Sequence, residues 1–250
     1  MTDVTKALAG RLLEARRTGA PITLNEVERP ASEAAAYAVQ AAVTAALGPI
    51  GGWKVGAAGP DAAPSGAPLP GSGILPSGAA LDATFTDRLV ESEIAFRLGQ
   101  DLPPRREAYT KDEIMAAIAS CHPVIEIVQW RVRDFATASN PVKLADSVGH
   151  GALIVGEAIT GWQGIDFPRL DVRQEIAGAA TKQAVGNPAG DMIRLIAWLA
   201  NEGAVWAGGL RAGQIVTCGS WTGALPAPAG AAVNVTFAGT TPVSVQFAAA

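Results

Sequence analysis

The chain has 250 residues, of which 49% are hydrophobic and 17% charged, and its formal net charge is −4. This length and apolar content suffice for one large domain or two small ones with a hydrophobic core. Lys and Arg form no cluster, which argues against a nucleic-acid-binding surface and against a polybasic membrane patch.

Cellular location is indicated only by weak features. Cys121 and Cys218 lie far apart without metal-ligand spacing, so neither a zinc site nor a disulfide framework is predicted, and this usage fits a reducing compartment. The first residues lack the basic and apolar regions of a signal peptide, and no stretch reaches membrane-spanning length. We therefore expect a cytoplasmic protein with no membrane association.

The chain is predicted to open with two helices, at residues 3–18 and 33–47, which are rich in Ala, Leu, Glu and Arg. Gly48 and Pro49 end the second helix. From Gly51 to about Asp82, repeated Gly, Pro and Ser predict loops and turns, with a mobile lid as one interpretation.

A third helix is predicted from Thr110 to about Ser120, because Thr110 and Glu113 form a capping-box pattern. A later helix is expected at about 189–202, after the start signal Asn187-Pro188. Short β-branched runs predict strands at 124–128, 152–155, 170–176, 214–217, 232–237 and 242–247.

Helices at the front followed by many short strands indicate an α+β fold. There is no internal repeat and no convincing linker, so we expect a single domain over residues 1–250. Its N-terminal helical segment would span 1–50 and its β core 51–250.

Two glutamates, Glu91 and Glu93, lie one residue apart in a run that otherwise predicts a strand. Side chains alternate between the faces of a strand, so both glutamates point one way while Val90 and Ile94 point the other way. On a partly buried face, two like charges are tolerated only when a cation or a shared proton offsets them.

A third carboxylate, Glu126, lies within the apolar run 124–128. It could form an ion pair with Arg131 or lie on a solvated edge strand, and Glu91 and Glu93 taken alone could also form a solvated face. Taken together, however, the three carboxylates form an oxygen-ligand set that suits Mg²⁺ or Mn²⁺. Zinc is disfavoured because no His or Cys accompanies them.

Other polar residues allow a structural and a functional interpretation. Lys54 is either a surface lysine with a buried stem or a cation for a carboxylate substrate. His122 and His150 belong to no Ser-His-Asp grouping and are interpreted as structural. The segment 218–223 is either an ordinary turn or one that presents hydroxyls and amides to a ligand.

Several of these segments, taken together, resemble one known family. The chain is similar to the 2-keto-4-pentenoate hydratase group within the fumarylacetoacetate hydrolase superfamily. The resemblance runs in order over nearly the whole chain, at residues 52–56, 91–96 with 101–103, 123–128 with Arg131, and 197–201 with the turn 218–223. Four such segments in register are specific for the superfamily.

The resemblance implies a mixed β-sheet rolled into a barrel-like core around a divalent metal, Mg²⁺ or Mn²⁺. It implies Glu91, Glu93 and Glu126 as metal ligands and Lys54 as a catalytic residue that faces the substrate. Ser220 and, through a looser match, Asp146 are implied as substrate contacts. The subunits are expected to form a homo-oligomer.

The implied activity is a metal-dependent hydratase in aromatic-compound degradation. It would add water to a short unsaturated 2-oxo acid, such as 2-hydroxypenta-2,4-dienoate, to give a 4-hydroxy-2-oxo acid. One feature departs from the family: hydratases of this group carry an acid before the Glu-x-Glu strand, and residues 68–72 contain none, with Asp61 and Asp82 as the nearest.

This departure keeps other interpretations open. A 2-oxohexenedioate decarboxylase or an acylpyruvate-type hydrolase could use the same metal site. An inactive family member that binds a small acid is the alternative of a different class.

Overall fold

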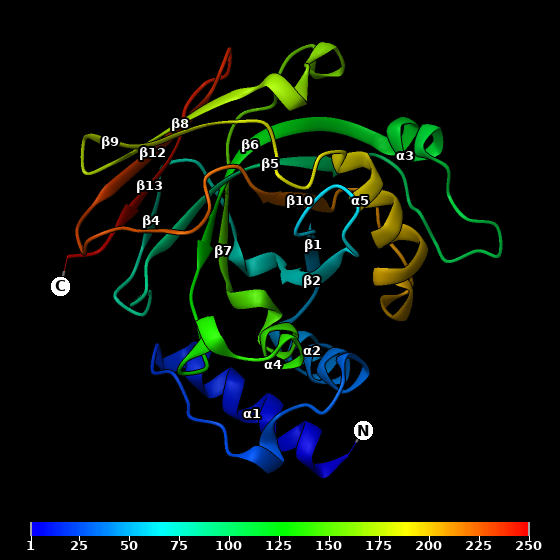
Figure 1. The fold of residues 1–250 in the computed structure, drawn as a ribbon, viewed down its shortest axis with the longest axis vertical. Helices are drawn as coiled ribbons and strands as arrows, with labels where there is room; N and C mark the ends of the chain where they lie inside the picture. The colour runs from blue at the N-terminus through cyan, green and yellow to red at the C-terminus, as the bar shows by residue number, and fades with distance from the viewer. Residues whose placement is uncertain (1, 250) are drawn as a thin grey trace.

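Residues 2–249 of the computed structural model are described here, and they form α-helices packed against two β-sheets (Figure 1). The α-helices are α1 (Asp3–Thr18), α2 (Glu33–Leu47), α3 (Lys111–Ala117), α4 (Asn140–Ala145) and α5 (Met192–Trp198). The strands are β1 (Ile50–Gly56), β2 (Ser65–Pro70), β3 (Ile74–Pro76), β4 (Ala79–Leu81), β5 (Leu89–Leu98), β6 (Ile118–Val128), β7 (His150–Val155), β8 (Asp171–Ile176), β9 (Ala179–Val185), β10 (Ile215–Ser220), β11 (Leu225–Pro226), β12 (Ala232–Phe237) and β13 (Val243–Phe247).

The two N-terminal helices have the predicted bounds. The side chains of Thr2 and Ser32 each accept a hydrogen bond from a first-turn amide, which caps α1 and α2. Their buried residues, including Leu8 and Val39, pack with Leu144 of α4 in a hydrophobic cluster of their own. In Figure 1 these three helices lie together at one end of the molecule.

The larger sheet has the strand order β2-β1-β10-β5-β6-β7-β3, and β11 pairs with β5. Its central pair is antiparallel, with Glu91 of β5 directly opposite Glu126 of β6. The smaller sheet has the order β4-β13-β12-β8-β9. Segments distant in sequence thus become neighbours in the larger sheet, where β1 pairs in parallel with β10.

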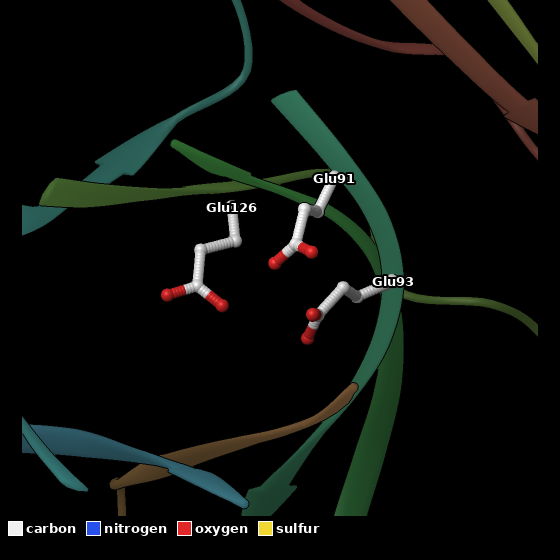
Figure 2. A group of neighbouring side chains, drawn as sticks. All are labelled: Glu91, Glu93 and Glu126. Carbon is white, nitrogen blue, oxygen red and sulfur yellow. The ribbon is translucent and has the colours of Figure 1, made fainter. Parts of the chain in front are cut away.

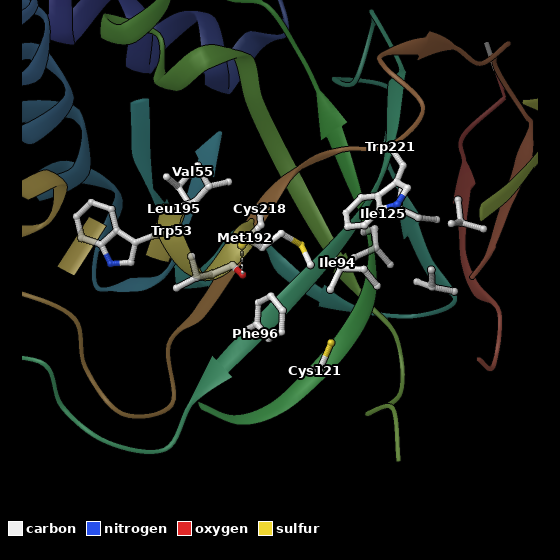
Figure 3. Packing of buried hydrophobic residues seen from close by; sticks show 14 of the residues in the cluster. Trp53, Val55, Ile94, Phe96, Cys121, Ile125, Met192, Leu195, Cys218 and Trp221 are labelled. Carbon is white, nitrogen blue, oxygen red and sulfur yellow. Dashed lines mark hydrogen bonds between the residues drawn. The ribbon is translucent and has the colours of Figure 1, made fainter. Parts of the chain in front are cut away.

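The main hydrophobic core covers one face of the larger sheet. Ile94 and Phe96 of β5 point into it, together with Trp53 of β1 and Leu195 of α5 (Figure 3). The opposite face holds a smaller cluster that includes Ala95 and is the face on which the glutamates lie. The prediction that Val90 and Ile94 point away from the two glutamates is confirmed, because both belong to the main core.

Both cysteines are free and buried in this core, as Figure 3 shows. Burial raises the pKa of the Cys121 thiol to about 12. The two thiols therefore behave as small apolar side chains, in agreement with the prediction of no disulfide framework.

The α+β class is confirmed, but the barrel-like core that the resemblance implied is not, because no closed barrel is found. Among residues 2–249 the larger sheet ends at β2 on one side and β3 on the other, with no pairing between them. β2 contains Pro68 and Pro70, and proline has no N–H to donate to a further strand. The two prolines are therefore compatible with the position of β2 at the edge of the sheet.

The interpretation of residues 51–82 as loops and turns is correct for connections such as 57–64 but wrong for most of the stretch. This stretch contains β1, β2, β3 and β4, of which β1 and β2 pair antiparallel. Their sequences are poor in β-branched residues, so their conformation depends on pairing with distant strands. The exposed strand β9 was missed for the same reason.

Two helix boundaries also differ from the predictions. Helix α3 ends at Ala117 and β6 begins at once, although a helix to Ser120 was expected. Helix α5 begins at Met192 with Asp191 as its cap and continues as a π-helix over Leu199–Gly203. Asn187 does not start the helix, because its side-chain amide donates to the carbonyls of Cys218 and Gly219.

None of the helices described within residues 2–249 has the length and apolar character needed to cross a membrane.

Candidate active site

Three carboxylates converge on one point at the face of the larger sheet that lies opposite the main hydrophobic core (Figure 2). Glu91 and Glu93 project from β5, and Glu126 projects from the paired strand β6. One oxygen from each side chain lies within 4.8 Å of the others. The alternation of β5 and its register with β6 therefore produce the cluster.

The carboxylate oxygens differ in their partners. Glu93 Oε2 accepts hydrogen bonds from the hydroxyl of Thr217 and from the amide of Gly219, at 3.1 Å for the amide. Glu126 Oε1 accepts from Lys54 and His150, whereas Glu126 Oε2 is buried and has no hydrogen-bond partner among residues 2–249. One side of each of these two carboxylates is thus fixed while the other side is free.

Lys54 and His150 lie on either side of Glu126. Lys54 Nζ is 2.6 Å from Glu126 Oε1 and 3.3 Å from the carbonyl oxygen of Val148. His150 Nδ1 is 3.0 Å from the same carboxylate oxygen. Burial lowers the pKa of His150 to about 4, so its imidazole is neutral at pH 7. A carboxylate can only accept, so the imidazole proton lies on Nδ1.

The electrostatics of the cluster favour a cation. Burial, and then the neighbouring Glu126, raise the pKa of Glu91 to about 7 and that of Glu93 well above its ordinary value. Burial would also raise the pKa of Glu126, but the charge of Lys54 and the hydrogen bond from His150 lower it to about 2. A single lysine therefore offsets only part of the negative charge that three ionised carboxylates would carry.

The residues fit a divalent metal ion of the hard type. The donors are all carboxylate oxygens, which Mg²⁺ and similar ions prefer. The Oε2 atom of Glu126 is buried without a hydrogen-bond partner, which is energetically unfavourable. A bound cation would supply the missing partner. The side chain of Glu91 has no hydrogen bond to any described residue, so both of its carboxylate oxygens remain available.

A cavity of about 540 Å³ opens over the carboxylates. The predicted site residues Lys54, Glu91, Glu93, Glu126 and Ser220 all line it. The hydroxyl oxygen of Ser220 accepts from the amide of Thr222 at 3.3 Å, so its own O–H is free to donate to a ligand. Residues 57–58 and 63–66 of the Gly/Pro-rich stretch form one wall, and Asn140 and Lys143 of α4 lie at another.

Asp146 lies outside this lining. It is buried, and its carboxylate accepts from the side chain and the amide of Arg131 at 2.7 and 2.9 Å. Arg131 is thus the partner of Asp146 rather than of Glu126, which corrects the ion pair considered from sequence. The carboxylate of Asp146 is fully engaged by this pair.

His150 is the residue that the sequence interpretation underrated, since it contacts a carboxylate of the cluster. Its position follows from the pairing of β7 with β6, which places His150 opposite Val128. A histidine between two glycines carries no local signal of such a contact. The acids Asp61 and Asp82 do not line the cavity, so neither replaces the acid missing from residues 68–72.

Comparison with known proteins identifies relatives over part of the chain. No family model matches the sequence. The chain is 27% identical over 158 residues to 2-hydroxyhexa-2,4-dienoate hydratase of Comamonas testosteroni, a stretch that covers 63% of this chain and 59% of that protein. It is also 27% identical over 132 residues to 2-keto-4-pentenoate hydratase of Paraburkholderia xenovorans strain LB400, covering 52% of this chain and 48% of that protein.

Solved structures extend the similarity to the whole fold. The 4-oxalocrotonate decarboxylase from Pseudomonas putida G7, complexed with magnesium and adipate, superposes with a TM-score of 0.86 at 24% identity and covers 99% of this chain and 98% of its own. The same enzyme has also been solved with calcium and acetate. The resemblance to 2-keto-4-pentenoate hydratases is confirmed by the curated relatives, and the fold is that of the decarboxylase.

Proposed function

We propose that this protein is a metal-dependent hydratase that adds water to a short unsaturated 2-oxo acid such as 2-hydroxypenta-2,4-dienoate. The observation that carries the proposal is the convergence of Glu91, Glu93 and Glu126 beside Lys54 in one cavity. The hydratase names of the curated relatives support the reaction class, although each match spans less than two thirds of the relative.

In this proposal, Glu91, Glu93 and Glu126 hold Mg²⁺ or Mn²⁺. When bound, the ion supplies a Lewis acid that polarises the 2-oxo group of the substrate and stabilises negative charge on it. Of these two ions, magnesium has the additional support of the decarboxylase complex.

Lys54 is proposed to supply positive charge and a proton inside the cavity. An ammonium group has three donors, and Glu126 and Val148 use two of them. The third donor is free for the enolate oxygen or for a substrate carbon. Burial opposes the charged form, but the three carboxylates together raise the pKa of Lys54, so it is protonated at neutral pH.

The proposed reaction balances as two steps. The 2-hydroxyl group of the diene loses its proton while C5 gains one, which gives the conjugated 2-oxo-3-ene. Water then adds its oxygen to C4 and a proton to C3, giving 4-hydroxy-2-oxopentanoate. Ser220 is proposed to orient the substrate through its free O–H, and Asp146 acts only through Arg131.

The test is an assay with Mg²⁺ and 2-hydroxypenta-2,4-dienoate that follows loss of the diene absorbance and identifies the product by mass. We expect metal-dependent turnover that chelation abolishes and Mg²⁺ restores. Metal binding without turnover on any 2-oxo acid would contradict the hydratase and favour an inactive small-acid-binding protein.

Decarboxylation of a 2-oxohexenedioate is the second candidate. Among the described residues, Glu33 is the only lining carboxyl group outside the cluster, and residues 68–72 contain no acid. This favours decarboxylation, because loss of CO₂ forms the dienolate directly and, unlike hydration, needs no acid to protonate C5. Release of CO₂ from 2-oxohex-3-enedioate, faster than hydration of the monoacid, would favour this candidate.

The expected homo-oligomer stays a prediction. Sedimentation of the metal-loaded protein checks it, and a mass equal to one chain at all concentrations would contradict it.

A further inference from the structure

The 146–150 turn, from Asp146 to His150, has an unusual backbone. Ser147, Val148 and Gly149 follow one another with positive φ values of 51°, 50° and 73°. This region disfavours L side chains, and β-branched residues such as Val148 most of all. Such a conformation persists only where the surrounding structure holds it.

Arg131 holds both ends of this turn. Its guanidinium donates to the carbonyl oxygen of Asp146 at 3.0 Å and to that of His150 at 2.7 Å. The same group pairs with Asp146 Oδ1 at 2.7 Å, and both side chains are only 2% exposed. Arg16 adds a longer hydrogen bond to the carbonyl of His150, at 3.2 Å.

The 146–150 turn also contacts the carboxylate cluster and its lysine at two points. His150 Nδ1 donates to Glu126 Oε1 and so fixes the orientation of that carboxylate. The carbonyl of Val148 accepts from Lys54 Nζ and so directs the ammonium group. Neither contact would keep its geometry if the turn relaxed to an ordinary backbone conformation.

We propose that Arg131, paired with Asp146, is a positioning residue that keeps the strained 146–150 turn in the conformation the site requires. Through His150 it sets the orientation of Glu126 and hence cation affinity. Through Val148 it directs Lys54 and hence turnover. The second effect rests on the proposed function, whereas the first requires only that the carboxylates bind a cation.

The test is a double-mutant cycle of Arg131→Lys and Ser147→Gly, with Mg²⁺ affinity measured by calorimetry. Lysine cannot bond both carbonyls and the carboxylate in the same planar geometry. We expect Arg131→Lys to weaken Mg²⁺ binding about tenfold, the low end of the range for outer-shell partners of metal ligands.

In the Ser147→Gly background we expect the same change to cost about threefold, because glycine adopts the left-handed conformation freely and the turn then depends less on its clamp. Ser147 is buried outside the cavity lining, so its replacement removes no group from the binding surface. Equal losses in the two backgrounds, or no loss in either, would overturn the proposal.

The matched control is Arg211→Lys, in an exposed ion pair with Asp101, which should leave Mg²⁺ affinity unchanged. If Arg131→Lys fails to fold, the double variant Arg131→Met, Asp146→Leu carries the test, because an apolar pair can replace a buried ion pair without loss of stability. A folded double variant with wild-type affinity would refute the positioning role.

Activity provides a separate readout. At saturating Mg²⁺, Arg131→Lys should still lower kcat. This loss adds to the loss of Mg²⁺ affinity that calorimetry measures. If the wild type binds Mg²⁺ but turns over no 2-oxo acid, the proposed function fails while the calorimetric cycle still decides the positioning role.

Discussion

Glu126 takes its ionisation from two residues that are distant in sequence. Burial alone would raise the pKa of this carboxyl group, yet Lys54 from β1 and His150 from β7 lower it to about 2. Glu93, on the same sheet face, accepts hydrogen bonds only from neutral groups, and its pKa is raised well above the ordinary value. Side chains of one chemical type therefore have pKa values shifted in opposite directions within one cluster.

The first prediction at this scale concerns Glu93→Gln. Because burial and the neighbouring carboxylates raise the pKa of Glu93 and so disfavour its charged form without metal, the neutral amide should leave the melting temperature of the chelated protein unchanged or raise it. Mg²⁺ affinity should fall by more than about 100-fold, since a ligand is lost rather than an outer-shell partner. Calorimetry and thermal melting check both expectations.

The exposed variant Glu107→Gln is the control for Glu93→Gln and should bind Mg²⁺ as the wild type does. If Glu93→Gln also bound Mg²⁺ normally, the acidic face would be a solvated surface rather than a metal site.

The second prediction concerns Lys54→Met. We expect kcat to fall by about 10²- to 10⁴-fold, the range for a lost proton-transfer group. Mg²⁺ should bind at least as tightly, because the substitution removes a positive charge that repels the ion and His150 still orients Glu126. Steady-state kinetics and calorimetry on the same samples check this split.

Lys182→Met on the exposed strand β9 is the matched control and should change neither quantity. A parallel loss of kcat and Mg²⁺ affinity in Lys54→Met would show that Lys54 acts mainly by ordering the carboxylates.

At the scale of elements, local signals located some boundaries and missed others. Helix α3 has a complete capping box, in which Thr110 and Glu113 bond each other's backbone amides. The amide of Thr110 and then Arg105 lower the pKa of Glu113 from 4.5 to about 2. Capping chemistry of this kind lies within four residues and is therefore visible in the sequence.

This cap gives the third prediction, for Glu113→Gln. The folded-state pKa is lowered, so the carboxylate contributes stability that is complete above about pH 4.5 and is lost as the pH falls through about 2. The melting temperature of Glu113→Gln should therefore lie below that of the wild type at neutral pH, and the gap should close near pH 2.

Thermal melts at a series of pH values check the expectation for Glu113. Asp61→Asn, in an exposed turn, is the control and should show no such gap. A gap that stayed constant down to pH 2 would mean that the charge of Glu113 does not contribute.

At the scale of the whole molecule, the two sheets share one hydrophobic core. Phe237 of β12 makes an edge contact with Trp221, which follows β10, with ring centroids 5.3 Å apart. Ser92 of β5 bonds Gln174 of β8 across the same interface at 3.0 Å. These contacts join the smaller sheet to the sheet that bears the site.

The fourth prediction is that Phe237→Ala destabilises the whole chain cooperatively. We expect the free energy of unfolding to fall by about 3–5 kcal/mol, the usual cost of truncating a buried aromatic residue. Urea unfolding, followed by tryptophan fluorescence and by circular dichroism, should give one coincident transition.

Val185→Ala, at a position that is 60% exposed, is the control and should change stability little. Two separate transitions in the wild type or in Phe237→Ala would contradict the single domain proposed for residues 1–250.

The sequence by itself determined the features that depend on neighbouring residues. Helices α1 and α2, the shared face of Glu91 and Glu93, and the apolar strand around Glu126 all follow from periodicity or caps that span a few residues. The residue types alone also indicated Mg²⁺ or Mn²⁺, because carboxylates without His or Cys suit these ions better than zinc.

Only the tertiary structure decided which of these residues meet. The pairing of β5 with β6 brings Glu126 opposite Glu91, and the pairing of β6 with β7 brings His150 to Glu126. Contacts between distant segments also produce the strands within 51–82 and the open edges of the larger sheet. They produce the Arg131–Asp146 pair as well. Contacts between distant segments depend on register and packing of the whole chain, and no local pattern encodes them.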